Sequence, residues 1–290
     1  MNTPTHTRAV ARDVGSAAQP PGGPTHWKLR DIDLSRTDQR HRRDVALFYM
    51  LAGASFIESG SAIYLRNLLG YYGDDAQISD WLRNEWEPEE LQHGAALRAY
   101  VTKVWPEFDW ARAYRAFLAE YSVAAAPDAF EATPRLELAA RCMIETGTAS
   151  FYRMLHEYVD EPVLRQLLGH IRDDEVRHYK HFLLFFRGRQ ALEGGGRLKV
   201  IAAILRRVRE SRTDDAWIAF RHAFELRNPG RPCGRSDFEA WQMEVRAIMR
   251  RTFPFRLTAQ MLLVPLALPV FIRPLARRAA EAGLRRMLLA

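Results

Sequence analysis

Two copies of one short motif contain the residues that could do chemistry in this sequence. The pattern Glu-x-x-His occurs at Glu90–His93 and again at Glu175–His178. Residues three positions apart share a helix face, so each carboxylate and its imidazole could reach one metal ion. Oxygen and nitrogen donors without a thiolate favour iron or manganese at a redox site. The pattern is short enough to arise by chance, and the surrounding sequence must decide its meaning.

A further glutamate precedes each motif at a similar distance. Glu58 lies 32 residues before Glu90, and Glu145 lies 30 residues before Glu175. Both upstream glutamates stand in apolar stretches, where a carboxylate without a partner is costly to bury. On antiparallel helices the two members of each pair lie at similar heights, roughly 17 to 21 Å from the connecting turn. The alternative is that all six side chains form ordinary surface ion pairs.

Four carboxylates and two imidazoles on four helices are the ligand set of ferritin-like di-iron and di-manganese proteins. The four negative charges would balance two divalent cations. We therefore predict a di-metal site whose ligands are Glu58, Glu90, His93, Glu145, Glu175 and His178.

Long helices must position these residues. Leu, Ala, Arg and Glu dominate the chain beyond residue 30, and strand-type alternation is absent, which predicts an all-α fold. Glycines, prolines and acidic pairs place helix ends so that helices cover about 40–69, 76–104, 108–121, 134–159 and 162–192. Thr133 is the expected N-cap of the fourth helix, with Pro134 at its first position.

Short loops between long helices favour antiparallel neighbours. We therefore predict that residues 31–192 form a ferritin-like four-helix bundle and that additional C-terminal helices follow it. Residues 1–30, rich in Thr, Pro, Gly and Ala, predict a disordered tail. Residues 193–290 predict two or three further basic helices that pack on the bundle or touch a membrane.

Composition narrows the function classes. Of the 290 residues, 48% are hydrophobic and 27% charged, which excludes a disordered chain. Two cysteines exclude a disulfide scaffold and a thiolate metal site, and they favour a reducing, cytoplasmic setting. No apolar run near the N-terminus indicates a secretory signal.

Positive charge collects in the C-terminal part of the chain. From Lys180 onward there are 22 Lys and Arg against 9 Asp and Glu. This excess favours an acidic partner such as a carrier protein or an anionic lipid, although a solvated basic face is the simpler explanation. Nucleic-acid-binding motifs are absent from the sequence, so we expect no nucleic-acid partner.

One apolar run near the C-terminus has two interpretations. Residues 257–272 contain no charge, and arginines flank them on both sides. Sixteen residues with two prolines fall short of the roughly 20 needed to span a bilayer as a helix. The run is expected to be a core segment capping the bundle or, with the arginines up to residue 278, a peripheral membrane contact.

Four segments resemble a known family. The segment 86–94 (WEPEELQHG) resembles the W-x-x-E-E-x-x-H-G segment of soluble acyl-carrier-protein desaturases, and its continuation 95–100 resembles their bacterial members. The segment 145–148 (ETGT) resembles the E-x-x-T segment of that family, and 174–178 (DEVRH) resembles its D-E-x-x-H segment. The resemblance covers roughly residues 40–190.

The resemblance implies roles for individual residues. The six predicted ligands would bind two iron ions, with Glu90 and Glu145 bridging them. Thr148 matches a threonine beside the oxygen site that relays protons. Asp174 matches a carboxylate that hydrogen-bonds a ligating histidine, here His93. The sequence departs from the family at Ile144, where the family usually has Gln, and it shows no counterpart of the family's electron-relay Trp on the first helix.

The implied activity is O₂-dependent insertion of a cis double bond into a carrier-linked fatty acyl chain. The implied partners are an acyl carrier protein and a ferredoxin-type electron donor, and family members are commonly homodimers. A different di-iron oxygenase acting on a lipid or secondary metabolite is the alternative: a hydroxylase, an N-oxygenase or a decarbonylase. Iron storage or peroxide scavenging is a third hypothesis.

Overall fold

The computed structural model describes residues 27–124, 130–210 and 214–290, and these residues confirm an all-α fold without strands. Of the predicted tail, residues 1–26 lie outside the described residues, whereas Trp27 is buried and a short 3₁₀ turn begins at Leu29. The helices are α1 (Val45–Ser59), α2 (Ser61–Tyr72), α3 (Ala76–Trp81), α4 (Glu87–Val104), α5 (Trp110–Ala124), α6 (Pro134–Tyr158), α7 (Pro162–Glu193), α8 (Arg197–Glu210), α9 (Asp214–Arg227), α10 (Arg235–Thr252), α11 (Phe255–Leu263) and α12 (Arg273–Leu289).

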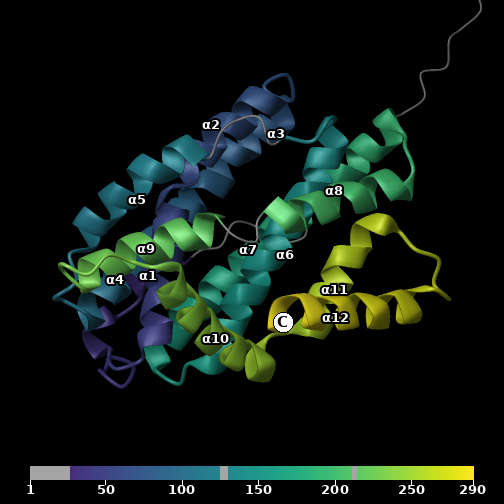
Figure 1. Cartoon of the computed structure of the whole chain (residues 1–290). Helices are drawn as coiled ribbons and strands as arrows, with labels where there is room; N and C mark the ends of the chain where they lie inside the picture. Colours follow the sequence, from purple (N-terminus) through teal and green to yellow (C-terminus); the bar gives the residue numbers. More distant parts are fainter. Residues whose placement is uncertain (1–26, 125–129, 211–213) are drawn as a thin grey trace, which may run out of the picture.

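Four helices form two packed pairs (Figure 1). Helix α6 packs along α7, helix α1 packs along α4, and α4 also contacts α7. The predicted N-cap of α6 is confirmed, because the Thr133 side chain accepts a hydrogen bond from the backbone N–H of Leu136 and Pro134 follows it. The predicted ends of α6 and α7 agree with the structure to within one residue.

The first predicted helix is broken into two. Helices α1 and α2 meet at Gly60 with a bend of 41°. The backbone of Gly60 departs from helical geometry, and its N–H donates to the carbonyls of both Phe56 and Ile57. The break follows Glu58 directly, so this glutamate lies in the last turn of α1.

The second predicted helix is interrupted by a π-helical turn, η3 (Leu82–Trp86), between α3 and α4. The backbone N–H of Glu87 donates to the carbonyl of Leu82, five residues earlier. Pro88 follows at the start of α4, where its ring would clash with a carbonyl in a continuous α-helix. The wider turn accommodates this proline and sets the direction in which α4 presents Glu90.

The apolar core consists of two large clusters. One cluster takes residues from α7 up to Ile171, and the other takes them from Tyr179 onward. Glu175 and His178 lie between these points on the same helix. The gap in the apolar pattern of α7 therefore marks the level at which polar groups are buried.

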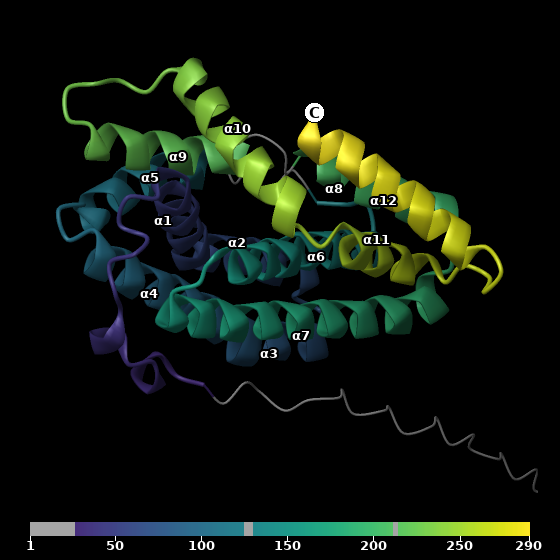
Figure 2. The ribbon, with the colours of Figure 1, turned by 90° about the horizontal axis from the view of Figure 1, so that it is seen from below.

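Five helices follow the four central ones in the described chain, where two or three were expected. Four of them pack onto earlier helices: α8, α10 and α11 contact α6, and α9 contacts α1 and α5. Helix α12 packs on α11 and α10. Figure 2 shows α10, α11 and α12 on one side of the α6–α7 pair. In the described residues no single helix has the length and apolarity to cross a membrane, although the bent pair α1 and α2 meets the criterion jointly.

Candidate metal centre

All six predicted ligands are buried and come together between the two helix pairs. Helix α1 presents Glu58, and α4 presents its motif from its first two turns. Helix α6 presents Glu145, and α7 presents the second motif from its middle. Each of the six side chains belongs to a residue that is at most 8% exposed.

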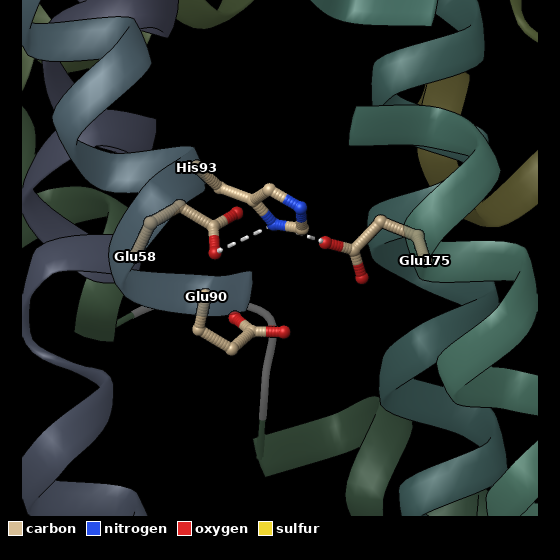
Figure 3. Close-up of side chains that lie close together, drawn as sticks. All are labelled: Glu58, Glu90, His93 and Glu175. Carbon is tan, nitrogen blue, oxygen red and sulfur yellow. Dashed lines mark ion pairs between the residues drawn. The ribbon is translucent and has the colours of Figure 1, made fainter. Parts of the chain in front are cut away.

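The ligands form two overlapping groups whose donor atoms lie within 4.8 Å of one another. One group consists of Glu58, Glu90, His93 and Glu175, and the other consists of Glu90, Glu145, Glu175 and His178. Figure 3 shows the first group, with Glu58, Glu90 and His93 pointing toward Glu175 from the opposite side. The two groups share Glu90 and Glu175. The family resemblance implies Glu90 and Glu145 as bridging residues, whereas the two donor groups have Glu90 and Glu175 in common.

The two histidines occupy equivalent positions. His93 Nδ1 lies 3.2 Å from Glu175 Oε1 and 3.9 Å from Glu58 Oε2. His178 Nδ1 lies 3.0 Å from Glu90 Oε1 and 3.8 Å from Glu145 Oε2. In both cases Nδ1 is the nitrogen that faces the carboxylates.

Buried atoms without hydrogen bonds mark the centre of the site. Among the described residues, Nδ1 of both histidines and Oε1 of Glu175 are buried and have no hydrogen-bond partner. Buried polar atoms of this kind are costly unless something satisfies them. A cation between the carboxylates would do so, and the mixed oxygen and nitrogen donor set suits iron or manganese. The residues therefore fit a metal ion.

A second layer of charged groups orients the imidazoles. The prediction for Asp174 is confirmed, because His93 Nε2 lies 3.0 Å from Asp174 Oδ2. His178 Nε2 lies 2.8 Å from Glu89 Oε2. Arg177 joins the two carboxylates, at 3.0 Å from Asp174 and 2.6 Å from Glu89. With the Nε2 proton directed at a carboxylate, the Nδ1 lone pair of each ring is left free for a metal.

The sequence analysis missed Glu89 and Arg177, although a signal for Glu89 was present. An acidic residue precedes the glutamate of each motif: Glu89 stands before Glu90, and Asp174 stands before Glu175. In the fold each of these carboxylates pairs with the histidine of the other motif. The repeat is therefore an acidic residue followed by Glu-x-x-His.

Trp27 completes the outer layer. Its indole N–H donates to Asp174 Oδ2 at 2.8 Å, and its ring lies parallel to that of His93 with the centroids 6.3 Å apart. It also stacks on His170. The family resemblance implies a tryptophan on the first helix, which the sequence does not show, and residue 27 was predicted to belong to the disordered tail. The structure instead brings Trp27 to Asp174 from the segment before α1.

Two hydroxyl groups hold ligand carboxylates. Thr148, which the sequence analysis singled out, donates from Oγ1 to Glu175 Oε2 at 2.6 Å. The phenol of Tyr152 donates to Glu58 Oε1. The sequence analysis missed Tyr152, although it lies two helical turns after Glu145 on the same face of α6.

The charges in the site explain its pKa shifts. Burial, followed by repulsion between neighbouring carboxylates, raises the pKa of Glu90 and Glu145 well above the ordinary value, and the same causes raise that of Glu58. Burial also acts against ionisation of Glu175, but the close contact with His93 and the charges of both histidines lower its pKa. Burial opposes protonation of His93, yet Asp174 and Glu175 raise its pKa to about 10. Without a metal, protons on these groups therefore offset the negative charge that a cation would otherwise balance.

Close packing of α1 on α4 fixes the distance between Glu58 and His93. A Cβ atom on Gly94 would lie 2.5 Å from Ser59 Oγ and 2.7 Å from the Ser59 backbone nitrogen. Only glycine permits this approach, and the two ligands are the immediate neighbours of Ser59 and Gly94 in the chain. The glycine of the 86–94 segment is thus part of the site geometry.

Comparisons with protein-family models and with curated proteins found no match for this chain.

Proposed function

We propose that this chain is a ferritin-like di-iron oxidoreductase that uses O₂ to introduce a cis double bond into a carrier-linked fatty acyl chain. The observation that carries the proposal is the pair of buried donor groups that share Glu90 and Glu175. Two cations side by side explain why four carboxylates are buried within a few ångströms of one another. The resemblance of four segments to soluble acyl-carrier-protein desaturases supports the reaction and its substrate class.

The chain's own residues do the positioning. The first group would hold one ion and the second group the other, with the shared carboxylates between them. Bound iron supplies one-electron redox chemistry with O₂, which is needed to remove hydrogen from an unactivated C–H bond. Asp174 and Glu89 fix the orientation of the two imidazoles. The apolar clusters on both sides of the site exclude water from it.

Contacts around Glu175 suit proton and electron delivery. The Thr148 hydroxyl donates to Glu175 at 2.6 Å, so it can pass a proton to the carboxylate that both groups share. On the opposite side, Trp27, Asp174 and His93 form a continuous hydrogen-bonded chain that ends at the first group. This chain is a suitable entry point for electrons from a ferredoxin-type donor.

Mass spectrometry of the product tests the proposal. Protein loaded with iron is supplied with O₂, a ferredoxin reducing system and a panel of acyl carrier proteins bearing chains of different length. We expect loss of two hydrogen atoms from the acyl chain, and we expect the variant Glu175→Ala to abolish it. Glu281→Ala is the matched control, because Glu281 pairs only with Arg285 on α12, within the described contacts.

Other outcomes would change the assignment. Gain of one oxygen atom would mean hydroxylation and would favour the alternative oxygenase. An unchanged acyl chain in protein that holds its iron would contradict a carrier-linked substrate. Absence of bound iron or manganese would contradict the di-metal site itself.

A further inference from the structure

One end of the molecule combines two segments that are far apart in the sequence. The turn between α7 and α8 meets the loop between α11 and α12, and Figure 2 shows both at the same end of the ribbon. Arg197, the first residue of α8, donates from Nε to the carbonyl of Leu266 at 2.9 Å and from Nη2 to that of Ala267 at 3.2 Å. The start of α8 is therefore joined to the turn that follows α11.

This end of the molecule is unusually apolar. Six of the twelve exposed large hydrophobic residues in the described chain lie in residues 192–199 and 270–278, at the ends of these connections. We call the six the apolar tip: Leu192, Leu198, Val270, Phe271, Ile272 and Leu275. Leu198 is 81% exposed and Phe271 is 82% exposed, so their side chains project into solvent. Exposed apolar residues that gather at one end of a molecule favour an interaction surface.

The backbone holds the tip in this exposed position. Ala267 has a left-handed conformation with φ of 45°, which ends the 3₁₀ turn after α11 and redirects the chain. The N–H groups of Ile272 and Arg273 both donate to the carbonyl of Pro269, and Arg273 Nε donates to that of Leu268 at 2.7 Å. The exposed side chains therefore stand on an ordered turn.

The inner part of the same apolar run behaves differently. Met261 and Leu266 are buried in one cluster with residues of α6 and α7, and Ala259 is buried in a smaller cluster with Leu284 of α12. The expectation of a core segment is therefore met by α11 and the turn after it. The projecting part begins only beyond Ala267.

Positive charge surrounds the tip. Arg197, Lys199, Arg273 and Arg278 are exposed beside it, and residues 270–278 contain no acidic residue. In the segment 192–199 the one acidic residue is Glu193, whose side chain accepts from the backbone N–H of Arg135. Apolar side chains that project beyond a basic rim match the two layers of an anionic membrane surface, which are acyl chains below and negative headgroups above.

We infer that the apolar tip docks this protein on the surface of an anionic lipid bilayer. The tip enters the boundary between headgroups and acyl chains, and the surrounding arginines and lysine bind the lipid phosphates. A bilayer is favoured over a protein groove because the residues project separately, and because neutral apolar contact alone would not require a basic rim. The inference is independent of the proposed reaction.

Flotation with lipid vesicles tests the inference on the full chain. The vesicles consist of phosphatidylcholine alone or of phosphatidylcholine mixed with phosphatidylglycerol. We expect the protein to float with the anionic vesicles and to be released by high salt. The double variant Leu198→Asp/Phe271→Asp should bind roughly tenfold or more weakly, since charges replace the two most exposed apolar side chains of the tip.

A control variant separates the tip from general apolar exposure. Met243 is 61% exposed on α10, a helix that does not reach this end of the ribbon in Figure 2, so Met243→Asp should leave vesicle binding unchanged. A second double variant, Lys199→Glu/Arg278→Glu, should weaken binding to anionic vesicles without altering an apolar residue. Circular dichroism and metal content should match the wild type in all variants, because every substituted side chain is on the surface.

Three results would overturn the inference. The first is a protein that does not float with anionic vesicles, and the second is a Leu198→Asp/Phe271→Asp variant that floats as well as the wild type. The third is a Leu198→Asp/Phe271→Asp variant that loses binding to an acidic carrier protein, when neither the wild type nor the variant binds vesicles. This result would identify the tip as a protein-docking surface.

Discussion

The metal centre and the apolar tip depart in opposite directions from the usual distribution of residues. The centre buries six ionisable side chains, each in a residue at most 8% exposed, whereas the tip exposes six large apolar side chains. Both arrangements are unfavourable for an isolated folded chain. Each is also held by specific contacts: charged and hydroxyl partners surround the centre, and an ordered turn supports the tip. The comparison is consistent with our two proposals, that the centre holds cations and that the tip docks on a membrane surface.

We expect the largest effect from removing a carboxylate that both donor groups share. Glu175→Ala should reduce bound metal from about two ions per chain to near zero, since both donor groups lose a carboxylate. The loss in affinity should be roughly a hundredfold or more, beyond the effect of an outer-layer change. Metal analysis after desalting measures it. Retention of two ions would show that the cluster is not the metal site.

The second test compares two glycines, one beside the metal centre and one on α12, the helix that follows the tip. Gly94→Ala should destabilise the protein by about 1–3 kcal/mol, because the new methyl group must push α4 away from Ser59. Gly283 lies on α12 with no atom within 4 Å of a built Cβ, so Gly283→Ala should stabilise by about 0.5–1 kcal/mol. Urea denaturation of both variants gives the two free energies. Equal effects would mean that α1 and α4 do not need their close approach.

Variants of the outer carboxylates Asp174 and Glu89 test the two donor groups separately. Asp174→Asn should weaken the ion held with His93, and Glu89→Gln should weaken the ion held with His178, each by about 10–100-fold. Stepwise metal titration should then show one weakened and one unchanged site, with the roles exchanged between the variants. An equal loss at both sites in either variant would argue against a separate carboxylate for each imidazole.

The smallest expected effect is a dependence on pH. The folded protein raises the pKa of Glu58, Glu90 and Glu145 above 4.5 and that of His93 to about 10. These groups keep protons in the folded state where the unfolded chain has lost them. Their contribution to stability is therefore present at acidic pH and is lost as the pH rises above about 5.

The metal-free protein should accordingly lose unfolding free energy of the order of 1 kcal/mol between about pH 5.5 and pH 8. Metal binding should strengthen over the same range, because the ion displaces those protons. Urea denaturation with and without iron at several pH values measures both trends. A metal-free protein that gains stability toward pH 8 would contradict the shifts in the site.

Local signals in the sequence predicted much of the fold. Proline and glycine positions marked most helix ends, and the prediction that Thr133 is the N-cap of α6 is confirmed. The break at Gly60 and the π-turn before Pro88 were missed, since a helix with one glycine or proline continues in some contexts and stops in others. Periodicity alone could not decide between these outcomes.

The candidate site was likewise predicted only in part from the sequence. Types and spacing of the ligands were sufficient to find all six residues, because each pair of helices must place them at equal height. Tyr152 and Trp27 were missed because nothing near them in the sequence connects them to their partners. Trp27 stands 147 residues from Asp174 along the chain.

By itself, the sequence determined which donor atoms exist, which of them share a helix face, and where most helices begin and end. These properties depend on residue type and on separations of a few residues. The tertiary structure decided that Glu175 and not Glu145 is shared, that Arg177 joins the two outer carboxylates, and that the apolar run divides at Ala267 into a buried part and a projecting part. Those outcomes depend on how closely helices distant in the sequence approach one another, and this distance is set by packing across the whole molecule.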